Sequence, residues 1–215
     1  MHAYTTSRIS LPSQPVQTEP AGAFGSAQPQ LLTFFAAGSE IYAQGEKAGA
    51  FYQVEFGSVR VYRLLTDGRR QISAFHMPGE IFGFEAGATH HFFAEAINAT
   101  GIRVMRFPAG ADMSRHILPL ALKGLTRAQE HLLVLGRQNA IERIAAFLLD
   151  MAERQGGLQP VELPMSRTDI GDYLGLTIET VSRVFTKLKE KGVIRLPSLR
   201  SIEIVKYDAL RNISE

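Results

Sequence analysis

The sequence predicts an α+β fold in which a small β-barrel or jelly roll precedes a helical C-terminal part. From about residue 31 to about residue 107, short runs of alternating apolar and polar residues are separated by glycine-containing turns, which is typical of small barrels. Apolar residues then recur at three- and four-residue steps, as on one face of a long helix. Two short helical patterns joined at Gly175 follow, and a β-hairpin pattern comes after them.

The β-rich segment has clear strand and turn signals. The runs Ser58–Tyr62 and Gln71–Phe75 alternate apolar and polar residues, and Asp67-Gly68 between them is a typical hairpin turn. We therefore assign residues 31–112 to a β-roll domain. Residues 1–30 contain four prolines among Ser, Gln, Thr, Ala and Gly, a composition that predicts a flexible arm.

A long amphipathic helix is predicted over residues 113–137. Its apolar stripe consists of Leu118, Leu122, Leu125, Ala128, Leu132 and Leu135. A stripe of this kind either packs on the β domain of its own chain or pairs with a copy of itself, and we expect a homodimer. Gly136 interrupts the helical pattern, so residues 138–215 are assigned to a separate C-terminal domain whose first helix runs from Asn139 to about Arg154.

Residues 166–194 form a helix-turn-helix pattern. Ser166 and Asp169 have the spacing of a capping box at the start of the first helix, and Gly175 ends that helix. Thr177 caps the second helix, which ends at Gly192. Its predicted inner face consists of Ile178, Val181, Val184, Phe185 and Leu188. A following hairpin, residues 192–205 with its turn near Pro197-Ser198, adds a wing to this DNA-binding motif.

The outer face of the second helix carries side chains that suit DNA. Glu179, Ser182, Arg183 and Thr186 recur at steps of three and four residues, so they share one face. Arginine can bind guanine through two hydrogen bonds, glutamate can accept from the cytosine amino group, and serine can donate to a base or to the backbone. Thr177 and Lys189 complete the predicted DNA-binding set.

The charge distribution points the same way. The formal net charge of +2 says little, but residues 183–200 contain six Lys or Arg and one Glu. A basic stripe attracts phosphates. Taken alone, the stripe could be a solvated helix face, and the motif could be a winged domain that packs against protein. Stripe, motif and wing together favour double-stranded DNA as the partner.

The sequence resembles the Crp–Fnr superfamily over about residues 31–210. The matching segments are Gly38, Gly45, residues 51–54, 57–62, 75–80, 140–149 (AIERIAAFLL), 166–176 and 178–183. The most specific piece, Glu179-x-x-Ser182-Arg183, is similar to the Fnr/FixK branch, and the lack of cysteines makes the chain more FixK-like than Fnr-like. The resemblance implies a cyclic-nucleotide-binding-like jelly roll, a dimerisation helix and a winged helix-turn-helix.

The same resemblance implies a mode of action. A homodimer would bind a palindrome of TTGA-type half-sites as a transcription activator, with Arg183 on guanine, Glu179 on cytosine, and Ser182 on a thymine or a phosphate. Loops of the β domain would contact RNA polymerase. In Crp an Arg-Ser pair binds the cyclic phosphate, whereas the corresponding stretch here, residues 79–96, has no Arg, and Glu95 and Phe92-Phe93 would oppose an anion. We therefore expect no bound effector; the alternative is a ligand-gated regulator of the same superfamily.

Other functional classes lack a signal. The chain has no cysteine, which excludes disulfides and thiolate-bound zinc or iron–sulfur clusters. We interpret His76, His90 and His91 as structural, with the adjacent pair on a strand and facing opposite sides, and expect no metal or other cofactor. No P-loop, nucleophile elbow, zinc-protease or dinucleotide motif is present, so no enzyme is predicted. With no apolar run long enough for a membrane and no secretory signal, we expect a cytoplasmic protein.

Overall fold

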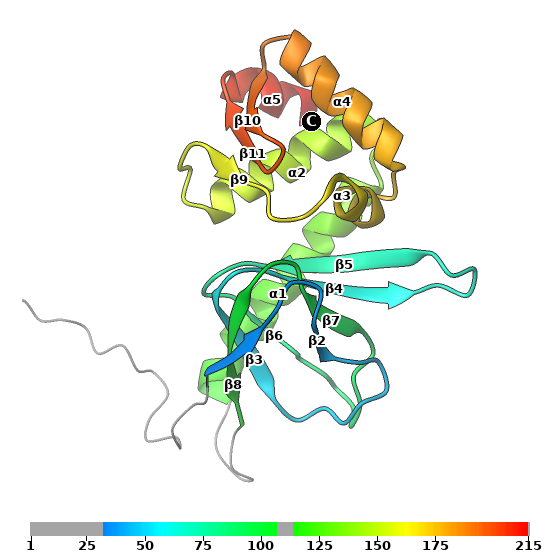
Figure 1. The fold of residues 1–215 in the computed structure, drawn as a ribbon, viewed down its shortest axis with the longest axis vertical. Helices are drawn as coiled ribbons and strands as arrows, with labels where there is room; N and C mark the ends of the chain where they lie inside the picture. The colour runs from blue at the N-terminus through cyan, green and yellow to red at the C-terminus, as the bar shows by residue number, and fades with distance from the viewer. Residues whose placement is uncertain (1–31, 107–113, 215) are drawn as a thin grey trace, which may run out of the picture.

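The computed structural model describes residues 32–106 and 114–214, so the arm predicted over residues 1–30 and the segment between strand β8 and helix α1 lie outside the described residues. Figure 1 shows a β domain below a mainly helical domain, with helix α1 running behind the β domain toward the upper part. The α+β prediction is confirmed, including the order of jelly roll, long helix and winged helix-turn-helix.

The β domain consists of two antiparallel four-stranded sheets, with strand orders β1-β8-β3-β6 and β2-β7-β4-β5. Alternate side chains point inward, as the sequence pattern requires, and Val54, Val59 and Ile102 are completely buried between the sheets. The strands are β1 Leu32–Phe35, β2 Glu40–Tyr42, β3 Phe51–Phe56, β4 Val59–Leu64, β5 Arg70–His76, β6 Ile81–Phe82, β7 Phe93–Ala96 and β8 Thr100–Met105.

The β4–β5 hairpin extends away from the body of the β domain and passes beneath helix α3 (Figure 1). Its turn uses the predicted Asp67-Gly68 pair: Gly68 has a φ of +83°, and the Leu65 amide donates to the Arg69 carbonyl over 2.8 Å. Ile72 and Phe75 of β5 are buried in the core of the upper domain rather than in the barrel. The hairpin therefore joins the two domains.

Helix α1 spans Ser114–Leu135 and helix α2 spans Ala140–Arg154. Four leucines of the α1 stripe, Leu118, Leu122, Leu125 and Leu132, are between 52% and 66% exposed. They do not pack on the β domain of the same chain, which decides against that alternative. Helix α2, by contrast, buries its apolar face completely, with Ile144, Leu148 and Met151 at 0% exposure.

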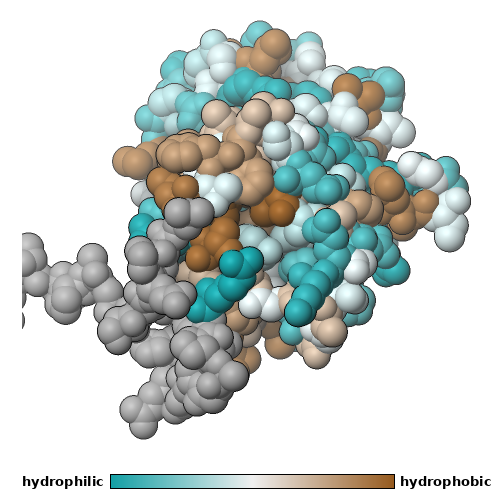
Figure 2. All heavy atoms as spheres, turned by 60° about the horizontal axis from the view of Figure 1, so that its bottom comes forward, coloured by the Kyte–Doolittle hydropathy of each residue, from teal (hydrophilic) through white to brown (hydrophobic). Residues whose placement is uncertain are grey.

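Exposed apolar side chains are not confined to α1. Figure 2, which views the molecule from its lower end, shows hydrophobic patches among hydrophilic side chains. On the β domain, Phe34 and Phe56 are exposed and contact each other, with ring centroids 5.8 Å apart. Because isolated apolar groups are common on soluble surfaces, the regular spacing of the α1 leucines distinguishes them from this pair.

The C-terminal domain packs three more helices and a small sheet around α2. The remaining elements are β9 Val161–Glu162, α3 Arg167–Leu174, α4 Ile178–Glu190, β10 Ile194–Ser198, β11 Ser201–Ile204 and α5 Tyr207–Ser214. The sheet has the order β10-β11-β9, and the turn of the wing falls at Leu199-Arg200. The turn expected at Pro197-Ser198 was wrong because both residues still belong to β10, where Ser198 pairs with Ser201. Strand β9 and helix α5 had not been predicted.

Candidate nucleic-acid interface

Helix α3 and the turn after it have the geometry that the sequence predicts. Ser166 Oγ accepts from the Asp169 amide over 3.0 Å, and the Asp169 carboxylate accepts from the Ser166 amide over 2.9 Å, which completes a capping box. Gly175 has a φ of +65°, so it ends the helix in the left-handed conformation that favours glycine. A Cβ on Gly171 would lie 2.6 Å from the Leu176 carbonyl oxygen. The turn therefore depends on two glycines.

Helix α4 is fixed on its inner face and capped at both ends. Thr177 Oγ1 accepts from the Thr180 amide over 3.3 Å, and Gly192 follows the helix with a φ of +63°. The inner face consists of Val181, Val184, Phe185 and Leu188, all buried. Ile178 was expected to belong to this face, but it is 44% exposed. Ile178 is the first residue of the helix, and its side chain lies outside the core that buries the later residues of this face.

The predicted DNA-binding residues lie together on the exposed face of α4. Glu179, Ser182, Arg183, Thr186 and Lys189 are all exposed, and Thr177 is exposed at the start of the helix. Arg183 donates to Thr180 Oγ1 over 3.3 Å, and Thr186 Oγ1 donates to the Ser182 carbonyl over 3.1 Å. These contacts are local to the helix, so the outer side chains can turn toward a ligand without breaking contacts to the core.

Glu179 is held in its charged form at the start of α4. Its pKa is lowered by a hydrogen bond from its own backbone amide, then by the Thr177 hydroxyl and by the positive charge of Arg183. A carboxylate in the first turn also interacts favourably with the helix dipole. At neutral pH it can therefore accept a hydrogen bond from a cytosine amino group.

Arg167 was missed by the sequence reasoning, and Arg200 was predicted only as part of the basic stripe of residues 183–200. The Arg167 guanidinium lies 3.4 Å from the centroid of the Phe185 ring, and the Arg200 guanidinium donates to the Pro164 carbonyl. Burial, with a smaller contribution from Arg200, lowers the pKa of Arg167 to about 10, so it stays charged at neutral pH. The signal for Arg167 was its place directly after the Ser166 cap, in the first turn of α3.

Side chains of the stretch expected to differ from a cyclic-nucleotide site, residues 79–96, contact neighbouring strands. The His90 ring stacks on Tyr42 with centroids 3.7 Å apart, and Phe93 stacks on Tyr62. Glu95 forms an ion pair with Arg60 of β4, so its charge is compensated rather than directed at a ligand. Residues 79–96 contain no Lys or Arg, and this stretch therefore does not fit the phosphate of a cyclic nucleotide.

The two adjacent histidines differ from the expectation. His90 and His91 lie just before β7 rather than on a strand, and both approach Glu85, with Nδ1 to carboxylate distances of 3.5 and 2.6 Å. Because residues 90 and 91 belong to neither a helix nor a strand, their side chains need not point to opposite sides, as they would on a strand. Among the described residues, no group of three or more His, Asp or Glu side chains has a geometry that could hold a metal ion.

Comparisons with known proteins agree with this geometry. Residues 32–111 match the cyclic nucleotide-binding domain family, and residues 142–213 match the Crp-like helix-turn-helix domain family. The chain is 56% identical over 200 residues to the nitrogen fixation regulation protein FixK of Rhizobium meliloti (strain 1021), covering 93% of this chain and 95% of that protein.

The chain belongs to the Crp/Fnr family of transcription regulators. Within this family it also matches the fumarate and nitrate reduction regulatory protein of Escherichia coli (strain K12), at 32% identity over 190 residues, covering 82% of this chain and 76% of that protein. The solved structure of FixK2 from Bradyrhizobium japonicum superimposes with a TM-score of 0.82 at 42% identity, covering 87% of this chain and 98% of that one.

Family membership places the chain among FixK/Fnr-type DNA-binding regulators and supports a protein without enzymatic activity, because these relatives are transcription regulators. No helix in the described ranges, 32–106 and 114–214, is long and apolar enough to cross a membrane. The prediction of a Crp–Fnr relative of the FixK type is confirmed.

Proposed function

We propose that this protein binds a palindrome of TTGA-type half-sites as a homodimer and activates transcription. The observation that carries the proposal is the outer face of α4, where Glu179, Ser182 and Arg183 are exposed on a helix whose opposite face is buried. A helix supported in this way can enter the major groove, and its N-terminal half is the part that reaches base edges.

Each side chain has a distinct role in this proposal. Arg183 binds guanine O6 and N7, Glu179 accepts from the opposed cytosine, and Ser182 contacts a thymine or a phosphate. Thr177, Thr186 and Lys189 contact the DNA backbone. Arg167, at the start of α3, and Arg200, in the turn of the wing, add positive charge toward the phosphates.

The dimer rests on α1. Its exposed leucines repeat at spacings that place them on one face, and burying them against the same face of a second copy removes apolar surface from water. In such a dimer the two α4 helices would enter successive major grooves about 34–36 Å apart. The half-sites are therefore inverted repeats about one helical turn apart.

Activation is supported by the relatives. The chain is 39% identical over 185 residues to the transcriptional activatory protein AadR of Rhodopseudomonas palustris (strain ATCC BAA-98 / CGA009). In our proposal the β domain is kept for contact with RNA polymerase and for holding the DNA-binding domain, and the protein acts without a bound effector. The lack of Lys and Arg in residues 79–96 supports the last point for cyclic nucleotides.

A ligand-gated regulator is the second candidate, and one observation favours it. A cavity of about 410 Å³ lies where the β domain, α1, α2 and α3 meet, and its lining includes Phe75, Glu80, Gly124, His131 and Tyr173. This volume falls within the range of small-molecule sites. None of the four exposed leucines of α1 lines the cavity, although Ala128 of the same stripe does.

Selection of bound duplexes from a random DNA pool tests the proposal. We expect a two-fold symmetric TTGA-type consensus with one preferred spacing; an asymmetric site, or no consensus, would contradict it. Thermal melting with cyclic AMP and cyclic GMP separates the two candidates. A saturable rise in melting temperature would support the ligand-gated alternative, whereas we expect no rise.

A further inference from the structure

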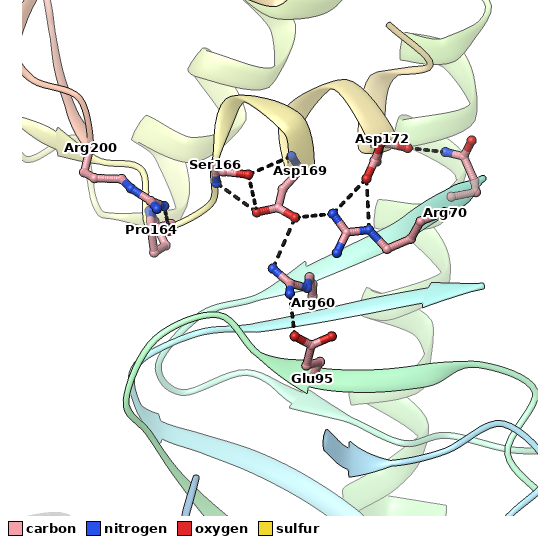
Figure 3. Close-up of polar contacts among 9 residues, drawn as sticks. Arg60, Arg70, Glu95, Pro164, Ser166, Asp169, Asp172 and Arg200 are labelled. Atoms are coloured by element: carbon pink, nitrogen blue, oxygen red, sulfur yellow. Dashed lines mark hydrogen bonds and ion pairs between the residues drawn. The ribbon is translucent and has the colours of Figure 1, made fainter. Parts of the chain in front are cut away.

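Five charged side chains join the β domain to the helix-turn-helix (Figure 3). Arg60 on β4 and Arg70 on β5 point up toward α3, where Asp169 and Asp172 point down. Glu95 on β7 holds Arg60 from the other side. We call these residues the interdomain ion cluster: Arg60, Arg70, Glu95, Asp169 and Asp172.

Asp169 is the centre of this cluster and has two tasks. One carboxylate oxygen, Oδ2, accepts from the Ser166 amide and hydroxyl and so caps α3. The other, Oδ1, accepts from Arg70 over 2.6 Å and from Arg60 over 3.2 Å. Asp169 is only 3% exposed, and a buried carboxylate is tolerated when its oxygens are paired in this way. The carboxylate that caps the start of α3 therefore also attaches α3 to the β domain.

Arg70 fixes a second point on the same helix. Its Nε and its Nη2 both contact Asp172 Oδ2, over 2.9 and 2.8 Å. Beside it, Gln71 donates to the Asp172 backbone carbonyl over 2.7 Å. Arg60 and Arg70 thus hold α3 near its first turn, while Arg70 and Gln71 hold it one turn later. Two attachment points on one helix fix its direction as well as its position.

The chain connection alone would not fix this direction. Four residues, 136–139, separate α1 from α2, so rotation at this turn would swing α3 and α4 relative to α1. Ile72 and Phe75 of β5 make an apolar contact with the core of the upper domain. This contact holds the two domains together but has little directional preference. Charge-assisted hydrogen bonds with guanidinium groups are strongly directional. A second directional contact lies at the end of α2, where the Arg154 guanidinium donates to Glu80 and to the Phe75 carbonyl of the β domain. That contact holds α2, whereas the ion cluster is the part of the joint that holds α3 itself, the helix that precedes α4.

We propose that Arg60 and Arg70 are positioning residues for DNA recognition, because they set the spacing and angle of the two α4 helices in the dimer and so select the distance between half-sites. This inference rests on the proposed function. Arg127 of α1 contacts Glu80 of the β domain over 2.7 Å, so the β domain is attached to the dimer helix as well as to α3. It acts as the rigid link between the dimer axis and the DNA reader.

Full-length protein carrying Arg60→Gln and Arg70→Gln tests the inference. Binding is measured to a single half-site duplex, to the palindrome chosen by selection, and to palindromes with one base pair added or removed between the half-sites. One base pair shifts a half-site by roughly 3.4 Å and about 35°. Arg69→Gln is the matched control, because Arg69 lies on the same hairpin, carries the same charge and pairs with Asp67 of the hairpin itself.

We expect the wild type and Arg69→Gln to prefer the selected spacing by about tenfold or more over either altered spacing, since a rigid dimer cannot follow the shift without bending the DNA. In the double variant this preference should fall to about threefold or less. Affinity for the single half-site should stay within about twofold of wild type, because α4 keeps its own core and caps. Arg70→Lys, which keeps the charge but cannot contact both aspartates through a planar group, should be intermediate.

Four results would overturn the inference. The double variant could keep the wild-type spacing preference, or lose half-site affinity in parallel with palindrome affinity, which would mark a structural role within α3. If thermal melting shows that the double variant is unfolded, Asp172→Asn decides instead: a spacing preference equal to wild type in that folded variant contradicts the proposal. A wild type with no preferred spacing would overturn the proposed function itself, and this inference with it.

Discussion

Helices α1 and α4 are both amphipathic, but their outer faces have opposite chemistry. The exposed face of α4 is polar and charged, and its apolar face is buried in the same chain. The exposed face of α1 is a row of leucines. A polar outer face is stable in contact with water, whereas exposing an apolar stripe of this length to water is unfavourable until another surface covers it. In the proposed function, the DNA-reading face of α4 is therefore complete within one chain, whereas the α1 stripe is covered only when two chains associate.

The largest effect is expected from a charge placed in the leucine stripe. Leu125→Glu should raise the dimer dissociation constant by about 100-fold or more, because each protomer would bury an unpaired carboxylate. Sedimentation velocity measures this directly. Thr126→Glu is the control, since the next residue is turned by about 100° around the helix. Equal loss of dimer in both variants would show that the stripe is not the interface.

Two leucines test the difference between the helices. Leu188 of α4 is 0% exposed and Leu132 of α1 is 66% exposed. In a monomeric Leu125→Glu background, Leu188→Ala should lower the free energy of unfolding by about 2–5 kcal/mol, and Leu132→Ala by less than about 0.5 kcal/mol. Urea denaturation followed by circular dichroism gives both values. Comparable losses would mean that α1 is packed within its own chain.

The cap of α4 should have a smaller effect. Thr177→Ala removes the acceptor for the Thr180 amide and should lower the free energy of unfolding by about 1 kcal/mol. Thr186→Ala makes the same side-chain change in the middle of the helix, where the hydroxyl bonds only to the local Ser182 carbonyl. We expect that control to stay within about 0.5 kcal/mol of wild type. If Thr186→Ala lowered the free energy of unfolding by more than this, the loss in Thr177→Ala could not be assigned to the helix cap.

The smallest effect is expected at Lys189, which lies toward the C-terminal end of the polar face. Lys189→Ala should weaken binding to all sequences to a similar degree and reduce the salt slope of the binding constant by about 1, as for the loss of one phosphate contact. Lys47→Ala removes the same charge from the β domain and should leave the slope unchanged. A change in base preference in Lys189→Ala would instead indicate contact with a base.

Much of the C-terminal domain could be predicted because its signals are local. The Ser166 cap, the Gly175 turn and the Thr177 cap are each encoded within a few residues, and the helical period assigned Val181, Phe185 and Leu188 to the core. Ile178 was assigned to the core by the same period, but periodicity does not say where the core begins.

The interdomain ion cluster could not be predicted in the same way. Arg60 and Asp169 are 109 residues apart in sequence. In the sequence Arg60 fits an ordinary surface position, and Asp169 gives only the signal of a helix cap. Glu95 was read as a carboxylate that would repel a ligand, although its partner was Arg60. Arg167 likewise gives no periodic signal, because its ring partner Phe185 belongs to the next helix. Pairing between distant elements depends on topology, which local patterns do not contain.

Selection from a random DNA pool, run in parallel with the wild type and with Arg183→Ala, tests the central claim that α4 reads the DNA sequence. We expect the wild type to return a symmetric consensus with one guanine fixed in each half-site. The variant should return the same symmetric consensus with that guanine position relaxed, a loss of about 1–3 kcal/mol of discrimination. An unchanged guanine preference in Arg183→Ala would contradict the claim.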